Sequence, residues 1–393
     1  MKEKFMVILV TGGCGFIGSN FINFWLKNHK KCKILNLDKL TYVGNMSSLG
    51  NARDNANYKF FNGDIGDFKF VNEIVSVFRP DCIINFAAET NIHRSLDCSD
   101  EFNQANIFGT RVLLEVAQKY KIKRFHQIST LSWIEEGGRV IRDISNPYVI
   151  SKVASEKLVE LFFNSFGLPI TITNCSNNYG YFQHPEKFIP RTITNLIDDG
   201  KVFVFGDGRQ VRNWLYVEDN CKAIEAVLIN GTIGESYDVG DFLGNVNNLE
   251  LVNIILEIMG KDKSCIEFVP DYAGHYNKFV INYGKISEEL GWSPTHRLQD
   301  MLVKTVTWYE KNEAWWRFLK KEAELLYHYY ESQKKNENFP LAANLLSSAI
   351  AIMELADKTD TRLPAWRLES KDIQPLINSE KRLDKETGRK KSY

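Results

Sequence analysis

The stretch FMVILVTGGCGFIGS, residues 5–19, decides the fold of this chain. An apolar run of strand length passes directly into a glycine-rich turn, and a helical pattern follows. Gly12 suits the tight turn, Gly15 lets the backbone approach a pyrophosphate, and Gly18 lets a helix pack closely on the strand. The stretch therefore predicts a strand–turn–helix unit that binds a dinucleotide.

The second apolar run, residues 32–38, ends in Asp38, about 20 residues after the glycines. A carboxylate there can accept hydrogen bonds from the ribose hydroxyls of an adenosine and would repel a 2′-phosphate. It therefore favours NAD over NADP, although a lysine follows it. Other positions expected around the cofactor lie at the start of the first helix and after the second, third and fourth strands: Phe16, Ile17, Lys39, Asp64, Ile65, Ala87 and Ala88.

Apolar, β-rich runs alternate with helical patterns up to about residue 180. The runs are FMVILVTG, CKILNLD, YKFFNGD, DCIINFAA, RFHQIST and PITITNCSN. This alternation predicts an α/β fold, a doubly wound parallel sheet of the Rossmann type, in residues 1–180. Pieces near 210–240 are expected to return to it. We expect a smaller, mixed α/β substrate lobe over 181–310, then a helical C-terminal extension over 311–393 with a polar, basic tail.

The composition points to a small-molecule partner. Lysine and arginine together number 49, as do aspartate and glutamate, so no net field favours nucleic acid or a membrane surface. The seven cysteines are scattered without metal-ligand spacing, which is typical of reduced thiols, and we expect no metal. No signal peptide or membrane-spanning run is visible, so we expect a cytoplasmic protein.

Tyr148 and Lys152 stand four residues apart at the start of a predicted helix, so their side chains share one face. An ammonium near a phenol favours the phenolate and lowers the phenol's pKa. Tyr148 could then take a proton from a substrate hydroxyl while hydride leaves the same carbon. Thr130, at the end of the preceding strand, could hold that hydroxyl. The predicted catalytic group is therefore Thr130, Tyr148 and Lys152.

With these motifs the chain resembles the extended short-chain dehydrogenases/reductases, and most closely the dTDP-glucose 4,6-dehydratases, over about residues 5–316. The matching segments are TGGCGFIGSNF, LDKLTYVGN, FAAETNIHRS, NIFGTRVLLE, PYVISKVASEKL, CSNNYGYFQHPEKFIPR, FGDGRQVRNWLYVED and KISEELGWSP. The resemblance implies NAD as cofactor, with Lys152 on the nicotinamide ribose beside Tyr148. It implies a dTDP- or UDP-hexose as substrate, and a homodimer built on helices around 106–120 and 150–165. It also implies a nucleotide-sugar site made of Glu89, Thr90, Asn177, Lys187, Arg212, Asn213 and His275.

Two adjacent positions depart from the family pattern. Members of the family continue the Ser-Thr pair with Asp-Glu. In them the Glu removes the C5 proton and the Asp protonates the departing C6 hydroxyl, after oxidation at C4. Here these positions are Leu131 and Ser132, and neither residue can replace the pair. Glu135 and Glu136 follow within the loop after Thr130 and could supply carboxylates if that loop folds inward.

Three interpretations follow. In the first, an NAD-dependent enzyme oxidises a nucleotide-diphosphate sugar at C4 and then epimerises it, or reaches another outcome that needs no Asp-Glu pair. In the second, the chain is a 4,6-dehydratase whose relocated carboxylates are Glu135 and Glu136. In the third, it binds NAD or a nucleotide sugar without turnover. We favour the first, because superfamily epimerases need only the oxidising group.

Overall fold

The computed structural model describes residues 6–136, 139–142, 146–271 and 281–334. Its largest sheet has seven strands in the order β12-β8-β5-β4-β1-β2-β3, and neighbouring strands are parallel throughout. The strands are β1 (Val7–Thr11), β2 (Lys33–Asp38), β3 (Tyr58–Asn62), β4 (Cys82–Asn85), β5 (Arg124–Thr130), β8 (Ile170–Cys175) and β12 (Ser236–Val239). The predicted doubly wound sheet is confirmed, and its seventh strand comes from the returning piece of chain.

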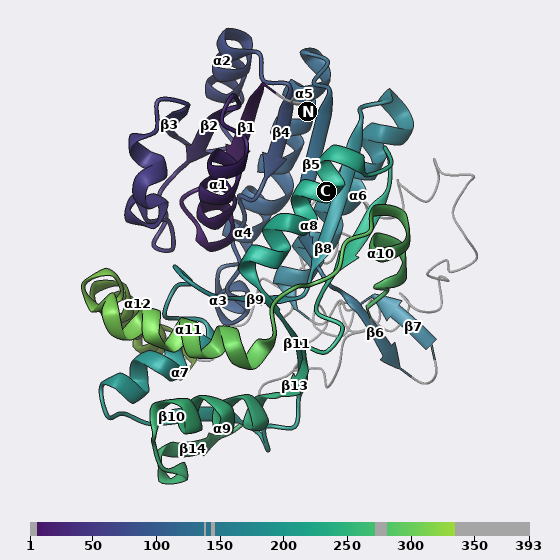
Figure 1. Cartoon of the computed structure of the whole chain (residues 1–393). Coiled ribbons are helices and arrows are strands. Elements are labelled where there is room, and N and C mark those ends of the chain that lie inside the picture. Colours follow the sequence, from purple (N-terminus) through teal and green to yellow (C-terminus); the bar gives the residue numbers. More distant parts are fainter. Residues whose placement is uncertain (1–5, 137–138, 143–145, 272–280, 335–393) are drawn as a thin grey trace, which may run out of the picture.

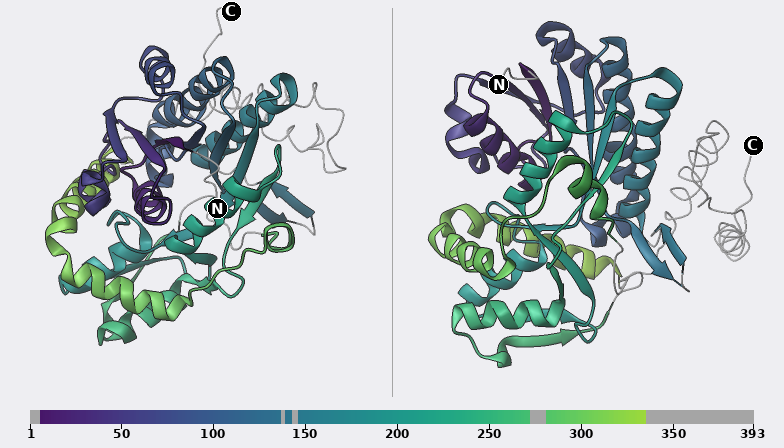
Figure 2. Two further views of the ribbon diagram at one scale, coloured as in Figure 1. Left: turned by 45° about the horizontal axis from the view of Figure 1, so that its top comes forward. Right: turned by 45° about the vertical axis from the view of Figure 1, so that its right-hand side comes forward.

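Helices cover both faces of this sheet, as Figures 1 and 2 show. One face carries α1 (Phe16–Asn28) and α8 (Val217–Asn230). The other carries α2 (Phe68–Phe78), α5 (Thr110–Lys119) and α6 (Pro147–Phe166). Strands covered on both sides can be apolar at every position, which is why the runs carry little alternation.

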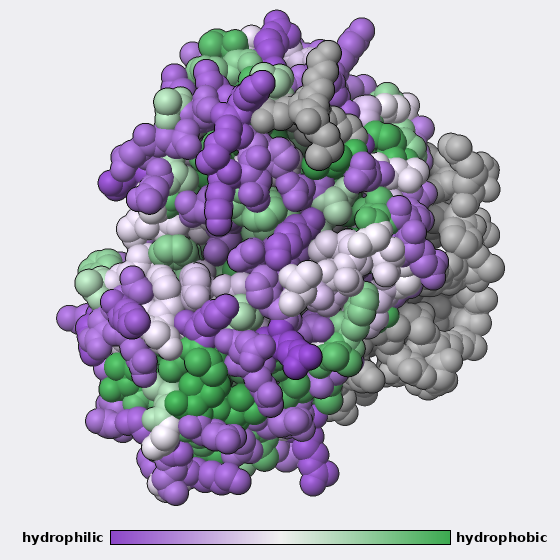
Figure 3. Space-filling model, viewed as in Figure 1, coloured by the Kyte–Doolittle hydropathy of each residue, from purple (hydrophilic) through white to green (hydrophobic). Residues whose placement is uncertain are grey.

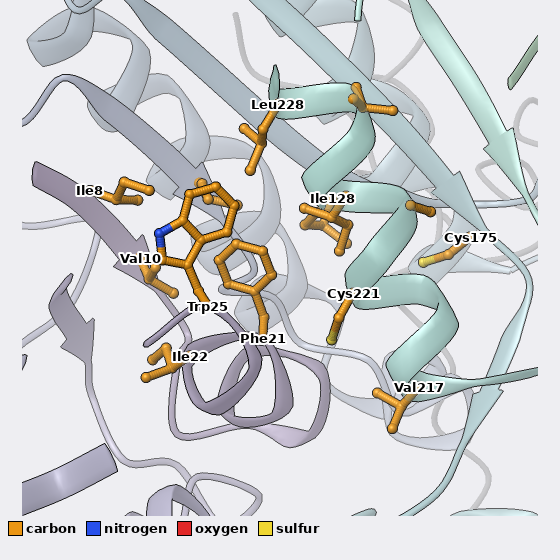
Figure 4. Close-up of a cluster of buried hydrophobic side chains, with 14 of the residues drawn as sticks. Ile8, Val10, Phe21, Ile22, Trp25, Ile128, Cys175, Val217, Cys221 and Leu228 are labelled. Carbon is orange, nitrogen blue, oxygen red and sulfur yellow. The ribbon is translucent and has the colours of Figure 1, made fainter. Parts of the chain in front are cut away.

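The core beneath α1 and α8 joins helices that are about 200 residues apart in the chain. Figure 4 shows Phe21 and Trp25 of α1 meeting Cys221 and Leu228 of α8 over the sheet, with Ile8 of β1 at the edge of the cluster. Burying such large apolar side chains contributes about 1.5–3 kcal/mol each. This packing holds the glycine turn at the start of α1 against the sheet.

The strand order reverses between β1 and β4. The chain leaves β1 toward β2 and leaves β4 toward β5, so the loops after these two strands diverge. In doubly wound sheets such a reversal opens a crevice at the carboxyl ends of the strands, where ligands bind. The turn at Gly12 lies at this point.

The smaller lobe lies below the carboxyl edge of the large sheet in Figure 1. A three-stranded sheet has the order β13-β11-β9, and β10 pairs with β14 in parallel. The strands are β9 (Asn177–Tyr179), β10 (Val202–Phe205), β11 (Val211–Tyr216), β13 (Asn245–Asn247) and β14 (Ile266–Val269). The helices are α7 (Phe188–Ile197), α9 (Asn248–Met259), α11 (Leu298–Lys311) and α12 (Glu313–Lys334). The remaining helical segments are η1 (Met46–Asp54), α3 (Ile92–Asp97), α4 (Ser99–Phe102), η2 (Asn103–Gly109), η3 (Lys263–Cys265) and α10 (Gly284–Leu290).

The start of α12 packs into the core of this lobe. Trp316 is fully buried in a cluster with residues of α7, α9 and α11, and its indole nitrogen donates to the carbonyl of Tyr309 at 2.7 Å. In Figure 3 apolar surface gathers over the lobe, at the bottom of the view. Within the described ranges, every helix falls short, in length or in apolar character, of what a membrane crossing requires. The domain boundaries near 180 and 310 stay predictions.

A β-hairpin stands where the sequence indicated a loop after Thr130. Strands β6 (Trp133–Glu136) and β7 (Arg139–Arg142) pair antiparallel, and Glu136 lies opposite Arg139. Each strand has four residues, too few for an alternating pattern to be read from the sequence. The hairpin projects from the body of the protein in Figures 1 and 2.

Asp219, in the first turn of α8, anchors the segment that leads into α11. Its buried carboxylate accepts hydrogen bonds from the backbone amides of Thr295 and His296, both at 2.9 Å, and from the Thr295 hydroxyl at 2.8 Å. Burial by itself would raise the pKa of Asp219, but these hydrogen bonds hold it below its ordinary value of 3.8. The carboxylate therefore ties the lobe to the large domain.

Asp219→Asn is expected to lower the free energy of unfolding at neutral pH by about 1–3 kcal/mol, because an amide NH₂ would face the amides that now donate to the carboxylate. Since the folded-state pKa is depressed, the stabilisation is present above the ordinary value of 3.8 and is lost as pH falls through the folded pKa. The difference from wild type should therefore shrink below pH 3.8. Urea unfolding at several pH values measures it.

The matched control for this experiment is Asp54→Asn, whose side chain is 78% exposed. It should leave the free energy of unfolding within about 0.5 kcal/mol of wild type. Equal midpoints for the Asp219 and Asp54 variants at neutral pH would contradict the anchoring role.

Candidate active site

A cavity of about 530 Å³ lies between the carboxyl edge of the large sheet and the smaller lobe. It is lined by most of the residues predicted from the sequence: Gly12, Gly15, Phe16, Ile17, Gly18, Asp38, Lys39, Asp64, Ile65, Ala87, Ala88, Glu89, Thr90, Thr130, Tyr148, Lys152, Asn177, Lys187, Arg212 and Asn213. Glu135 and Glu136 lie on β6, where the structure describes the backbone alone, and His275 lies outside the described residues. The fold thus gathers at one place residues that are up to 201 positions apart in the chain, from Gly12 to Asn213.

The glycine turn leaves room for an anion at the start of α1. Gly12 has φ +68°, and a Cβ there would lie 2.6 Å from the backbone nitrogen of Ala87. At Gly15, the N-cap of α1, a Cβ would meet, among the described residues, only the Gly12 carbonyl, at 3.3 Å. No described side chain caps this helix start. Its free amides therefore face the cavity and fit a pyrophosphate.

Asp38 closes the other side of this part of the cavity. Its two carboxylate oxygens accept hydrogen bonds from the amides of Cys14, at 2.9 Å, and Leu40, at 2.8 Å. Burial raises the pKa of Asp38, and these two amides and Lys39 oppose the increase. The ammonium of Lys39 lies 3.3 Å from the carboxylate of Asp64. Each oxygen of Asp38 keeps a lone pair for a ribose hydroxyl, which fits the adenosine half of NAD.

Thr130, Tyr148 and Lys152 meet at the end of β5. The side chains of Tyr148 and Thr130 share a hydrogen bond. The ammonium of Lys152 donates to the carbonyl of Ile128 at 2.8 Å, and burial lowers its pKa to about 8. Cys175, the partner of Thr130 in the β5–β8 pairing, lies beside them. This arrangement can hold a substrate hydroxyl and move its proton.

The prediction that Lys152 lowers the pKa of Tyr148 is wrong for this structure. Burial raises the pKa of Tyr148, Cys175 adds to the increase, and the hydrogen bond with Thr130 opposes it. Desolvation disfavours the phenolate, and the size of this desolvation effect cannot be predicted from a Tyr-x-x-x-Lys spacing. The phenol form of Tyr148 is therefore strongly favoured.

An apolar side chain stands next to Thr130 in the cavity wall. Leu131 is 5% exposed, and its amide donates to the carbonyl of Cys175 at 3.2 Å. Ser132 follows and is fully buried. Neither residue offers an ionisable group in the neutral pH range at this end of the cavity.

Several predicted substrate residues have protein partners in this structure. Glu89 pairs with Arg94 at 2.8 Å, and the ammonium of Lys187 donates to the carbonyl of Thr90 at 3.0 Å. The side-chain amide of Asn213 donates a hydrogen bond to the carbonyl of Asp241 and accepts one from the amide of Asp241. Their roles in binding a substrate stay predictions.

Among the polar residues that sequence reasoning missed are Asn106, which supports the loop after β4, and Glu186, which lines the cavity. Asn106, on η2, accepts from the Glu89 amide at 2.8 Å and donates to the Ser151 hydroxyl at 2.8 Å, so it fixes the loop after β4 against α6. Glu186 accepts from the Tyr42 hydroxyl at 3.0 Å and from Asn91 at 2.8 Å. Both lie in segments that matched the family, NIFGTRVLLE and CSNNYGYFQHPEKFIPR, which was the one available signal.

The carboxylate of Glu186 also pairs with Lys187 at 3.0 Å. Burial would raise its pKa, but Lys187, His184 and Asn91 together hold it at about 2. Glu186 therefore carries a negative charge within the cavity wall, between the lobe and the large domain.

Residues 9–305 match the model of the family described as GDP-mannose 4,6 dehydratase. A dTDP-glucose 4,6-dehydratase from Streptomyces niveus is 40% identical over 328 residues, which cover 80% of this chain and 96% of that protein. A solved dTDP-glucose 4,6-dehydratase from Streptomyces venezuelae, with NAD bound, has a TM-score of 0.76 and 36% identity over 80% of this chain and all of that one. A UDP-glucuronic acid 4-epimerase from Bacillus cereus, in complex with UDP-glucuronic acid and NAD, has a TM-score of 0.71 and 26% identity over 78% of this chain and 99% of that one.

Proposed function

Because the chain belongs to the GDP-mannose 4,6-dehydratase family of extended short-chain dehydrogenases/reductases, we propose that it epimerises a nucleotide-diphosphate hexose at C4 with NAD as cofactor. The observation that carries this proposal is the assembly of Thr130, Tyr148 and Lys152 at the end of β5, directly beside Leu131 and Ser132. The chain keeps the group that oxidises a sugar carbon. It lacks the family's acid and base at the positions used for elimination.

NAD, when bound, accepts a hydride from the sugar and gives it back. We assign its pyrophosphate to the turn at Gly12 and Gly15, its adenosine ribose to Asp38, and its nicotinamide ribose to Lys152. The open space at Gly15 and the free amides of α1 support this assignment, as does the NAD named with two solved relatives.

The nucleotide diphosphate of the substrate is assigned to the lobe side of the cavity. Arg212 and Lys187 line this side, and a guanidinium binds a pyrophosphate through paired, charge-assisted hydrogen bonds. We propose a dTDP- or UDP-hexose, since the relatives are named for dTDP-glucose and UDP-glucuronic acid.

Epimerisation needs fewer groups than elimination. Tyr148 takes the proton of the C4 hydroxyl on oxidation as the phenolate, and as the phenol it returns the proton to the C4 oxygen on reduction, with Thr130 holding that oxygen. Since burial favours the phenol, this step requires the charged ammonium of Lys152 to stabilise the phenolate. Turning the keto sugar over between the two steps inverts C4. Elimination also needs a base at C5 and an acid at the C6 hydroxyl, and Leu131 supplies neither.

A second candidate is 4,6-dehydration with carboxylates from the hairpin, Glu135 or Glu136. One observation favours it: the chain is 40% identical to a dehydratase but 26% identical to the epimerase compared with it.

The experiment that separates the two candidates is a product assay. Purified protein with NAD is incubated with dTDP-glucose, UDP-glucose and UDP-glucuronic acid, and the products are analysed by mass spectrometry and proton NMR. Unchanged mass with inverted C4 is expected. Loss of one water, together with deuterium at C5 when the reaction is run in heavy water, would establish dehydration and overturn the epimerase proposal. An authentic dTDP-glucose 4,6-dehydratase serves as the positive control.

Asp38→Ala is expected to weaken NAD binding by about tenfold or more, because two ribose hydroxyls lose a charged acceptor. Affinity for NADP should fall less, since the variant no longer repels a 2′-phosphate. Isothermal titration calorimetry with both cofactors measures the ratio. The control is Asp54→Ala, on the exposed surface of η1. An unchanged preference for NAD over NADP would contradict the assignment.

We also propose that two copies of the chain associate through α5 and α6. Phe108 is 44% exposed just before α5, and Phe166 is 54% exposed at the end of α6. Sedimentation velocity on the purified protein tests this, and a monomer at micromolar concentration would contradict it.

A further inference from the structure

Glu156 is a buried carboxylate that has no part in the steps proposed above. It lies one helical turn after Lys152 on α6 and is 1% exposed. The hydroxyl of Ser129 donates to its Oε1 at 2.5 Å. A charge taken out of water is costly unless partners compensate it, so a carboxylate at this position must be stabilised by its surroundings.

Its position follows a regular pattern between β5 and α6. Three consecutive residues of β5 each form a hydrogen bond with one residue of α6: Ile128 with Lys152, Ser129 with Glu156, and Thr130 with Tyr148. The three residues of α6 are spaced one helical turn apart. Residues four apart on a helix share one face. Glu156 is thus the third member of the row that contains the proposed catalytic pair.

We propose that Glu156 is a positioning residue, whose carboxylate keeps the ammonium of Lys152 charged and holds α6 in register on β5. Its effect on the charge of Lys152 can be measured on the protein alone. Its use in catalysis rests on the function proposed above.

The charges around Lys152 support this role. Burial lowers the pKa of Lys152, and Cys175 and Glu156 oppose the decrease. Burial raises the pKa of Cys175 itself to about 11, so at neutral pH this residue is an uncharged thiol. Of these two groups Glu156 is the carboxylate, and we therefore assign to it the negative charge that opposes the loss of the Lys152 proton. Without it, Lys152 would lose its proton at a lower pH.

Several of the described charged groups near α6 form ion pairs with residues other than Lys152. Tyr148 shares the helix face with Lys152 but favours its neutral form. The helices α3 to α5, which pack on α6, carry charged side chains that form ion pairs: Arg94 with Glu89 and Glu101, and Arg111 with Glu115.

The test is a titration of Lys152 by NMR in protein labelled with ¹³C at the lysine ε carbon. The signal of Lys152 is identified by its absence in Lys152→Arg. In Glu156→Gln the titration midpoint is expected to fall by about 1 pH unit or more, because the neighbouring negative charge is gone. Glu156→Asp, which keeps the charge, should restore most of the shift.

The matched control is Glu160→Gln, one turn further along α6, where Glu160 pairs with Lys157 at 2.6 Å. It should leave the midpoint of Lys152 unchanged. Ser129→Ala removes the hydrogen bond to Glu156 but no charge. It should lower the midpoint of Lys152 by less than Glu156→Gln does, because the carboxylate is no longer fixed in its position on α6. It also serves as the test if Glu156→Gln does not fold. An unchanged midpoint in Glu156→Gln, or in Ser129→Ala if Glu156→Gln does not fold, would overturn the proposal.

The enzyme assay gives a second measurement. In Glu156→Gln the alkaline limb of the kcat/KM profile should move to lower pH by the same amount as the NMR midpoint. If the NMR midpoint moves but wild type turns over no nucleotide sugar, the charge role stands and the proposed function fails. If the midpoint moves while the alkaline limb does not, Lys152 is charged by Glu156 but its charge is not used, which overturns the catalytic part.

Discussion

Tyr148→Phe is expected to lower kcat by about 10²–10⁴-fold, because the variant has no hydroxyl to take or return the proton at the C4 oxygen. The change removes one oxygen atom and keeps the ring, which contacts Phe102 edge-on at 6.4 Å between centroids. The fold and the binding of NAD should therefore persist. Product formation followed by mass spectrometry measures the loss, and calorimetry with NAD confirms that the cofactor site is intact.

The matched control is Tyr120→Phe. Tyr120 lies at the end of α5, and its hydroxyl donates a hydrogen bond to Asn72 at 3.1 Å. It is not among the residues that line the cavity. It should leave kcat within about twofold of wild type. Full activity in Tyr148→Phe would show that another group moves the proton. The prediction holds for dehydration as well, since both proposed reactions begin with oxidation at C4.

Gly12→Ala is expected to destabilise the protein by roughly 2–5 kcal/mol and to weaken NAD binding. At φ +68° an alanine costs about 1–2 kcal/mol. Its Cβ would also lie 2.6 Å from the Ala87 nitrogen and 2.7 Å from the Ala87 Cα, and such overpacking adds about 1–3 kcal/mol. Because both contacts are with backbone, the turn itself must move. Urea unfolding and calorimetry with NAD measure the two effects.

A control at Gly167 separates the effect of the close contact with Ala87 from the effect of the left-handed backbone conformation. Gly167 ends α6 with φ +65°, and no described atom lies within 4 Å of a Cβ placed there. Gly167→Ala should cost only the conformational term, about 1–2 kcal/mol, and leave NAD binding unchanged. If the two variants were equally destabilised, the close approach of Gly12 to Ala87 would not constrain the turn.

Local spacing was enough to predict the large sheet and the dinucleotide turn, whereas the residues of the nucleotide-sugar site were predicted from the family resemblance. The six apolar runs became six of the seven parallel strands, and the glycines, Asp38 and the Tyr148–Lys152 pair were visible as short motifs. Such patterns depend on neighbours within one strand or one helical turn, so the order of residues is sufficient to show them. The seventh strand, β12, was expected only as a returning piece, because four residues carry little periodicity.

The tertiary structure decided what depends on distant residues. Three features join separate elements: the hairpin after Thr130, the hydrogen bonds of Asn106 with Glu89 and Ser151, and the row of α6 residues that ends in Glu156. The pKa of Tyr148 moved opposite to the prediction, because desolvation depends on every atom packed around the phenol. By itself the sequence determined the sheet, the dinucleotide turn and the presence of Leu131 and Ser132 directly after the Ser-Thr pair. Packing alone decided how buried these two residues are, and how charged the residues around them are.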